Sequence, residues 1–173
     1  MFESIGEVRD FLETGGDVLL AIGVTLFAMW TLILERAWYF RISHPVDRKR
    51  VQGEWDERDD HSSWNAHQIR RLMISEVQAR LNAGLNMIGT LVALCPLLGL
   101  LGTVTGMIEV FDVMAIAGSG NARAMASGVS KATVPTMAGM VAALSGLILS
   151  VRIERFAREE GERVADHMTV AEE

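Results

Sequence analysis

The chain has 173 residues, half of them apolar, and a formal net charge of -6 at pH 7. Its mean hydropathy is +0.24, and long blocks rich in Ala, Leu, Met and Gly favour an all-helical membrane protein. The acidic balance argues against a nucleic-acid partner, because phosphate binding needs a basic face. A single cysteine, Cys95, excludes an internal disulfide and is interpreted as a buried residue of a packed helix.

The first segment, residues 1–15, predicts a short amphipathic helix that lies on a membrane surface. Apolar and acidic side chains recur there on opposite faces at helical spacing: Phe2, Ile5, Val8 and Leu12 against Glu3, Glu7 and Asp10. The acidic start and the lack of a small-residue cleavage site are unlike a signal peptide. We therefore expect the apolar helix that follows to be retained.

Three apolar blocks are each long enough to cross a bilayer, whose core of about 30 Å needs roughly 20 helical residues. We predict membrane-spanning helices at residues 16–40, 85–111 and 129–151. Trp38 and Tyr39 lie near the end of the first span, as aromatic residues do at a membrane interface. The second span contains Pro96, which membrane helices tolerate when neighbouring helices satisfy the freed backbone groups.

The segments between the spans differ in length and charge. Residues 41–84 predict a long charged loop with helices that extend the spans, and residues 54–60 are its expected solvated apex. Residues 112–128 predict a short loop with a turn at residues 118–121, so the second and third spans should pack antiparallel. Residues 152–173 form a polar tail.

The distribution of Lys and Arg predicts the orientation of the chain. Every Lys and Arg except Arg9, Arg123 and Lys131 lies between the first two spans or after the third. The positive-inside rule then places the N-terminus outside and the C-terminus inside, on the cytoplasmic side. The predicted fold is therefore an all-α membrane protein with three transmembrane helices, N-out and C-in, and long cytoplasmic helical extensions.

Soluble-enzyme and metal motifs are not found. Residues 99–106 are rich in glycine but lack the lysine and the preceding strand of a phosphate-binding loop. None of the four histidines has metal-ligand spacing: His44, His61, His67 and His167. We expect no enzymatic activity, no cofactor and no metal.

Small residues in the second span predict close helix packing. Gly99, Gly102 and Gly106 recur along it, and glycines at i and i+4 let helix backbones approach one another.

Threonines in the second and third spans are the candidate functional residues. At about 1.5 Å rise per residue, Thr103 and Thr136 lie roughly 12 and 10 Å below the same membrane surface, with Thr133 one turn above Thr136. Such hydroxyls either bond only their own helix backbone or line a polar pathway for an ion or a partner's ionisable group.

Two runs in the second and third spans resemble a known family. Residues 94–111 (LCPLLGLLGTVTGMIEVF) and 128–139 (GVSKATVPTMAG) are similar to the signature helices of the MotA/TolQ/ExbB proton channel family. The expected topology of the whole chain is also that of this family. Length and loop sizes resemble ExbB and TolQ more than MotA, which has a fourth span.

The resemblance implies a function and partners. In this family a pentamer of the large subunit surrounds two copies of a single-span partner, ExbD or TolR, whose span carries a proton-binding Asp. It implies that Thr103 and Thr136 line the pore and face that Asp. The expected function is a proton-driven motor in the Gram-negative inner membrane that energises TonB-dependent outer-membrane import. The alternatives are a TolQ-like motor for envelope constriction and a non-conducting accessory scaffold.

The sequence departs from the family pattern at two positions. Lys131 stands where ExbB and TolQ usually carry a Glu, and Glu109 stands where an uncharged residue is common. Both lie roughly 3 Å below the outer surface at about 1.5 Å per residue. They either pair, within one subunit or between neighbours, or extend separately to water.

Overall fold

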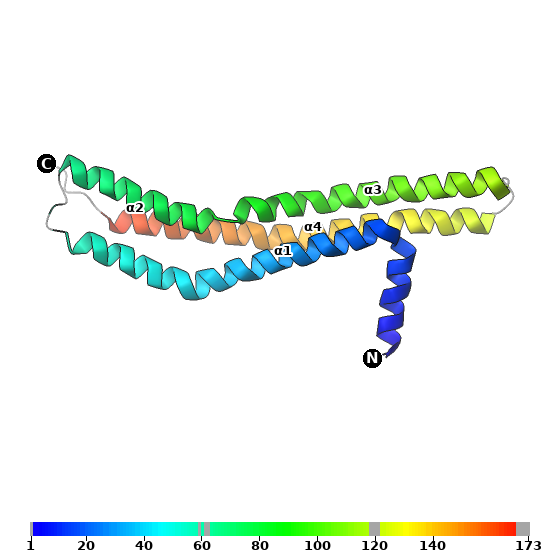
Figure 1. Ribbon diagram of the computed structural model, residues 1–173, viewed down its shortest axis with the longest axis horizontal. Helices are drawn as coiled ribbons and strands as arrows, with labels where there is room; N and C mark the ends of the chain where they lie inside the picture. Colours follow the sequence, from blue (N-terminus) through cyan, green and yellow to red (C-terminus); the bar gives the residue numbers. More distant parts are fainter. Residues whose placement is uncertain (1, 59, 61–62, 118–121, 169–173) are drawn as a thin grey trace. The chain divides into compact units, whose positions relative to one another are not determined.

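The computed structural model describes residues 2–58, 60, 63–117 and 122–168, and these residues form long α-helices (Figure 1). The helices are α1 (Phe2–Asp56), α2 (Trp64–Asn82), α3 (Leu85–Ala117) and α4 (Ala122–His167). No strand occurs among the described residues. The predicted all-α class is therefore confirmed.

Three helical segments are long and apolar enough to cross a membrane, which confirms the number of predicted spans. They are Gly16–Ile42, Trp64–Ile116 and Met125–His167. α3 and α4 extend to within a few residues of each other, so the connection between them is shorter than the expected loop at residues 112–128. The N-out, C-in orientation and the span boundaries stay predictions.

Two glycines interrupt the helical backbone. Gly16 has φ 63° and ψ -163° and divides α1 into two helices. Gly84 has φ 77° and separates α2 from α3. Glycine adopts this region of φ without the steric penalty that other residues pay. The side chains of residues 2–15 lie outside the described part of the chain, and with them the predicted amphipathic face.

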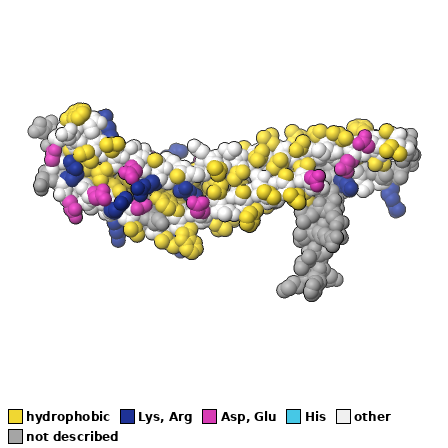
Figure 2. Space-filling view, viewed as in Figure 1, with side chains coloured by type: hydrophobic (Ala, Val, Ile, Leu, Met, Phe, Trp, Pro, Cys, Tyr) yellow, Lys and Arg dark blue, Asp and Glu magenta, His cyan; other side chains and the backbone are white. Residues whose placement is uncertain are grey.

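The chain forms two compact units. The first comprises Met1–Trp30 and Gly89–Leu147, and the second comprises Thr31–Ile88 and Ile148–Glu173. On the face shown in Figure 2, charged side chains gather over the second unit, whereas apolar side chains cover much of the first. The two units therefore differ in the polarity of this face.

The first unit is built on close contact between α3 and α4. A Cβ atom at Gly106 would lie 2.6 Å from Ala132 Cα, and one at Gly139 would lie 2.5 Å from the Cys95 carbonyl oxygen. Residue numbers rise along α3 as they fall along α4, so the two helices are antiparallel. At these points the backbones touch, which only glycine allows.

α1 completes this unit through an apolar cluster. Ile22 of α1 packs with Cys95 of α3 and with Ala142 and Ala143 of α4. Cys95 is fully buried, as the sequence predicted. Small side chains on α4 thus let both other helices approach it.

The second unit is held by charged and aromatic contacts. Arg48 of α1 donates to Glu160 of α4 at 3.2 Å, and the Glu160 side chain is only 5% exposed. Arg70 of α2 donates to the Ala165 carbonyl at 2.9 Å. Phe40 packs edge-on against Phe156, with ring centroids 5.3 Å apart. These contacts connect α1 and α2 to the last turns of α4.

The expected solvated apex at residues 54–60 is wrong for Trp55, which is 2% exposed. α1 continues to Asp56, and Trp55 lies one helical turn after the buried Val51. Both side chains occupy the inner face of α1 because residues four apart share a face. The charged residues on both sides of Trp55 led the sequence analysis to predict an exposed segment.

We predict that Gly106→Ala destabilises the protein by about 1–3 kcal/mol, because its Cβ overlaps the Ala132 backbone and the helices must separate. The matched control is Gly89→Ala in the same helix, where a Cβ meets nothing within 4 Å. That substitution should be neutral or slightly stabilising. Thermal unfolding in mild detergent measures both. Equal melting temperatures would contradict the close contact.

Candidate functional site

The candidate threonines of α3 and α4 lie in the first unit, and their hydroxyls contact different carbonyls. Thr103 donates to the Leu100 carbonyl at 2.7 Å, and Thr133 donates to the Ser130 carbonyl at 3.0 Å. Both bonds stay within one helix, as the simpler interpretation from sequence expected. Thr136 differs, because its hydroxyl crosses to the Gly99 carbonyl of α3 at 2.8 Å.

The depths of the three threonines are close but not equal. Thr136 lies level with Gly99, and Thr103 is four residues further along α3, about 6 Å along the helix axis. Thr133 is three residues from Thr136 in the same direction, because α4 is antiparallel. The depths of Thr103 and Thr136, expected to be similar, therefore differ by about one helical turn, and Thr133 is the closer match to Thr103.

The predicted packing glycines of α3 contact α4 close to these threonines. The Cβ position of Gly99 is 3.0 Å from Thr136 Cα, and that of Gly102 overlaps the Pro135 ring. Pro135 is inside α4 and has no backbone N–H to donate. This contact sets the register that brings the Thr136 hydroxyl to the Gly99 carbonyl.

These hydroxyls can serve a proton carrier in two ways. Each hydroxyl oxygen keeps lone pairs while its proton is directed at a carbonyl, so it can accept from a protonated carboxylic acid. If the hydroxyl rotates, it can donate to a carboxylate instead. The released carbonyl keeps its ordinary helical hydrogen bond, so rotation leaves no unsatisfied group.

Glu109 and Lys131 do not form an ion pair with each other within the chain. Both residues are described and exposed, and no salt bridge joins them. Of the alternatives that the sequence left open, the structure does not show the pair inside one subunit. Gly106 packs on Ala132, so α3 and α4 are close here, but both charged side chains are exposed. A pair between neighbouring subunits stays a prediction.

The sequence pattern did not reveal an apolar hollow of about 500 Å³ between α1 and α4 in the same unit. Leu26, Trp30, Met137 and Val141 line it. Its only hydroxyl, on Ser145, donates to the Ala142 carbonyl of its own helix at 2.7 Å. The hollow thus offers mainly apolar surface.

The family comparison covers the helices that hold these residues. Residues 40–166 match the MotA/TolQ/ExbB proton channel family. The chain belongs to this family. The match includes all of α2 and α3 and nearly all of α4, and therefore every candidate threonine.

Two relatives within the family carry the ExbB name. The chain is 45% identical over 74 residues to the putative biopolymer transport protein ExbB-like 1 of Synechocystis sp., covering 41% of this chain and 29% of that protein. It is 38% identical over 74 residues to the biopolymer transport protein exbB1 of Vibrio cholerae, covering 42% and 32%. Each alignment thus spans less than a third of the relative's length.

We predict that Glu109 and Lys131 interact only in the assembled oligomer. In a double-mutant cycle with Glu109→Gln and Lys131→Met, the double mutant should lie closer to wild type than the sum of the single effects. The expected coupling is about 0.5–3 kcal/mol, because removing one partner leaves the other charge without compensation in a partly desolvated site. Oligomer dissociation in detergent is the measurement. Additive effects would show that the two side chains extend separately to water.

Proposed function

We propose that this chain is an ExbB-like subunit of a proton-driven motor in the inner membrane of a Gram-negative bacterium. With an ExbD-like single-span partner it would energise a TonB-like protein and outer-membrane import. The observation that supports this most is the group of threonine hydroxyls, Thr103, Thr133 and Thr136, on two packed helices of a family member.

The proposed mechanism begins with the cost of a carboxylate at membrane depth. An ionised Asp on the partner is costly there. A threonine hydroxyl that rotates away from its carbonyl lowers that cost by donating to the carboxylate. Once the Asp is protonated, the hydroxyls return to their carbonyls and accept from the acid. The threonines thus serve both charge states.

The threonines differ in what this rotation disturbs. Thr103 and Thr133 release a carbonyl of their own helix, which leaves the helix contact unchanged. Thr136 releases the hydrogen bond that links α4 to α3. We therefore assign proton exchange mainly to Thr103 and Thr133, and to Thr136 a second task in holding the wall of the pathway.

Alternating protonation supplies the energy for motion. A proton that crosses the membrane potential releases about 2.3 kcal/mol per 100 mV. Each change in the charge of the partner's Asp alters which subunit face it prefers. Successive protonation and release then move the partner relative to the ring of subunits.

The glycines of α3 do not contribute to the contact between subunits in this proposal. α4 of the same chain already fills the face of Gly99, Gly102 and Gly106. Neighbouring subunits must therefore meet through other faces of the helices.

We predict that Thr103→Ala lowers proton flux about tenfold, because a lost hydrogen bond to a charged group costs roughly 1.5–3 kcal/mol. Thr136→Ala should lower both the flux and the melting temperature. Thr136→Ser keeps the hydroxyl, so both values should stay close to those of the wild type. The measurement is dye-reported flux into liposomes that contain the chain and its partner.

Thr105→Ala is the matched control for these variants. Thr105 is on the same helix and also donates to its own backbone, to the Leu101 and Gly102 carbonyls at 3.1 Å. It should conduct as wild type does. Unchanged flux in Thr103→Ala and Thr136→Ala would refute a role in the pathway, and absence of flux in the wild type would favour the accessory scaffold.

We predict a cyclic homo-oligomer, a pentamer, for the chain in mild detergent. Native mass spectrometry should give five copies, and the same mass is expected for Thr103→Ala, because its hydroxyl contacts only its own helix. A monomer would contradict the motor proposal.

A further inference from the structure

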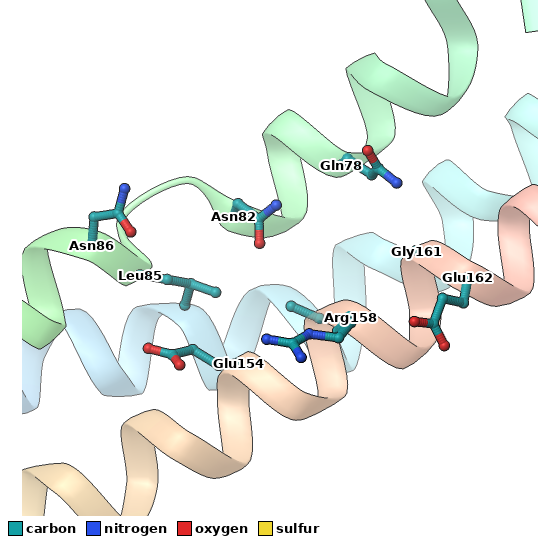
Figure 3. A pocket seen from close by; sticks show the side chains of 9 residues that line it. Gln78, Asn82, Leu85, Asn86, Glu154, Arg158, Gly161 and Glu162 are labelled. Carbon is teal, nitrogen blue, oxygen red and sulfur yellow. The ribbon is translucent and has the colours of Figure 1, made fainter. Parts of the chain in front are cut away.

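The second unit contains a polar hollow of about 580 Å³ where α2 ends and α3 begins, facing α4 (Figure 3). Three carboxamides from the α2–α3 side line it, Gln78, Asn82 and Asn86. Three charged residues from α4 lie opposite, Glu154, Arg158 and Glu162. The helix break at Gly84 opens this space, because the chain turns there at φ 77°.

The charges of the hollow have no partner in the part of the chain that the structure describes. Among the described residues, Arg158 makes no hydrogen bond or ion pair, and the same holds for Glu154 and Glu162. Figure 3 shows Glu154 and Arg158 projecting from α4 below Leu85, with Glu162 further along the helix. Some other charges in this unit are paired, such as Arg48 with Glu160 and Arg80 with Glu76, whereas exposed residues such as Arg155 are not paired with any described residue.

The charges alternate along α4. Glu154 precedes Arg158 by four residues and Glu162 follows it by four, about 6 Å along the axis in each direction. The first turn of α3 adds a partial positive charge on the opposite wall: it contains no acidic residue, and Gly84 before it has no side chain to cap its N–H groups. A ligand with a negative group flanked by a positive one complements this pattern.

The hollow also lies where both of its walls, the α2–α3 break and α4, change from apolar to polar residues. α3 continues from Leu85 as an apolar helix, whereas α2 before it is polar. On α4, the apolar residues up to Val151 are followed by Arg152 and then by Glu154. In a membrane helix this change from apolar to charged residues marks the depth of the lipid headgroups.

We propose that this hollow binds a phospholipid whose headgroup carries a phosphate and a primary ammonium, as phosphatidylethanolamine does. The phosphate lies between the Arg158 guanidinium and the N-terminal amides of α3. The ammonium donates to Glu154 or Glu162, one turn from Arg158, and the carboxamides complete the hydrogen bonds. Two carboxylates disfavour a purely anionic headgroup, and a trimethylammonium group has no N–H to donate.

The experiment measures lipid binding to the full, delipidated chain by native mass spectrometry. Phosphatidylethanolamine, phosphatidylglycerol and phosphatidylcholine are titrated separately in detergent. We expect phosphatidylethanolamine to bind about tenfold more tightly than the other two, the effect of one charge-assisted hydrogen bond. Arg158→Gln should weaken its binding by a similar factor. Glu154→Gln combined with Glu162→Gln should remove the preference over phosphatidylglycerol.

Arg155→Gln is the matched control, because Arg155 is exposed on the same helix and does not line the hollow. Circular dichroism verifies that each variant keeps its helices. Equal binding of the three lipids, or equal effects of Arg158→Gln and Arg155→Gln, would overturn the proposal. Tight binding of soluble phosphoethanolamine would also overturn it, in favour of a free ligand.

A change of oligomer mass in Arg158→Gln without loss of lipid would show that a second copy of the chain fills the hollow, and the lipid proposal would then be wrong. Lipid binding is measured without proton flux or import, so this proposal does not depend on the motor.

Discussion

The backbone contact between α3 and α4 is the constraint on which the first unit depends. At Gly106 and Gly139 the two helices are so close that a single methyl group would overlap backbone atoms of the other helix. In a membrane, lipid tails are as apolar as the helices, so packing and interhelical hydrogen bonds hold the helices together instead of the hydrophobic effect. The same contact allows Thr136 to reach the Gly99 carbonyl at 2.8 Å.

This contact also decides which surfaces remain for other molecules. The glycine face of α3 is occupied inside the subunit, so it is not available to another molecule. Thr133 is exposed and Thr103 is half-buried. Both hydroxyls bond only their own helix, so they can rotate without separating the helices. A rigid helix pair with adaptable hydroxyls suits a site whose ligand changes charge.

The second unit is stabilised by different physical interactions. Glu160 lies almost fully buried between Arg48 and Arg163, and the charge of a buried carboxylate must be compensated in this way. Glu154, Arg158 and Glu162 beside the helix break differ from Glu160, because they are exposed and line a polar hollow. The proposed lipid site rests on their alternating charges and on the three carboxamides that face them across the hollow.

The sequence by itself determined the helical class and the three spans, because apolar length and helical backbone satisfaction leave few other structures in a bilayer. It also determined the family, because residues 94–111 and 128–139 hold a dense pattern of glycine, threonine and proline. The burial of Cys95 followed from its apolar surroundings. All of these properties depend on residues close together in the chain.

Only the tertiary structure decided how the helices meet. Which carbonyl Thr136 contacts, and that Glu109 and Lys131 do not pair in one subunit, depend on the rotation and register of two helices. The burial of Trp55 and the hollow beside Gly84 depend on contacts between α1, α2 and α4. Hydrophobic patterns fix which residues form a helix, but a shift of one residue between helices changes every such contact at little cost in apolar burial.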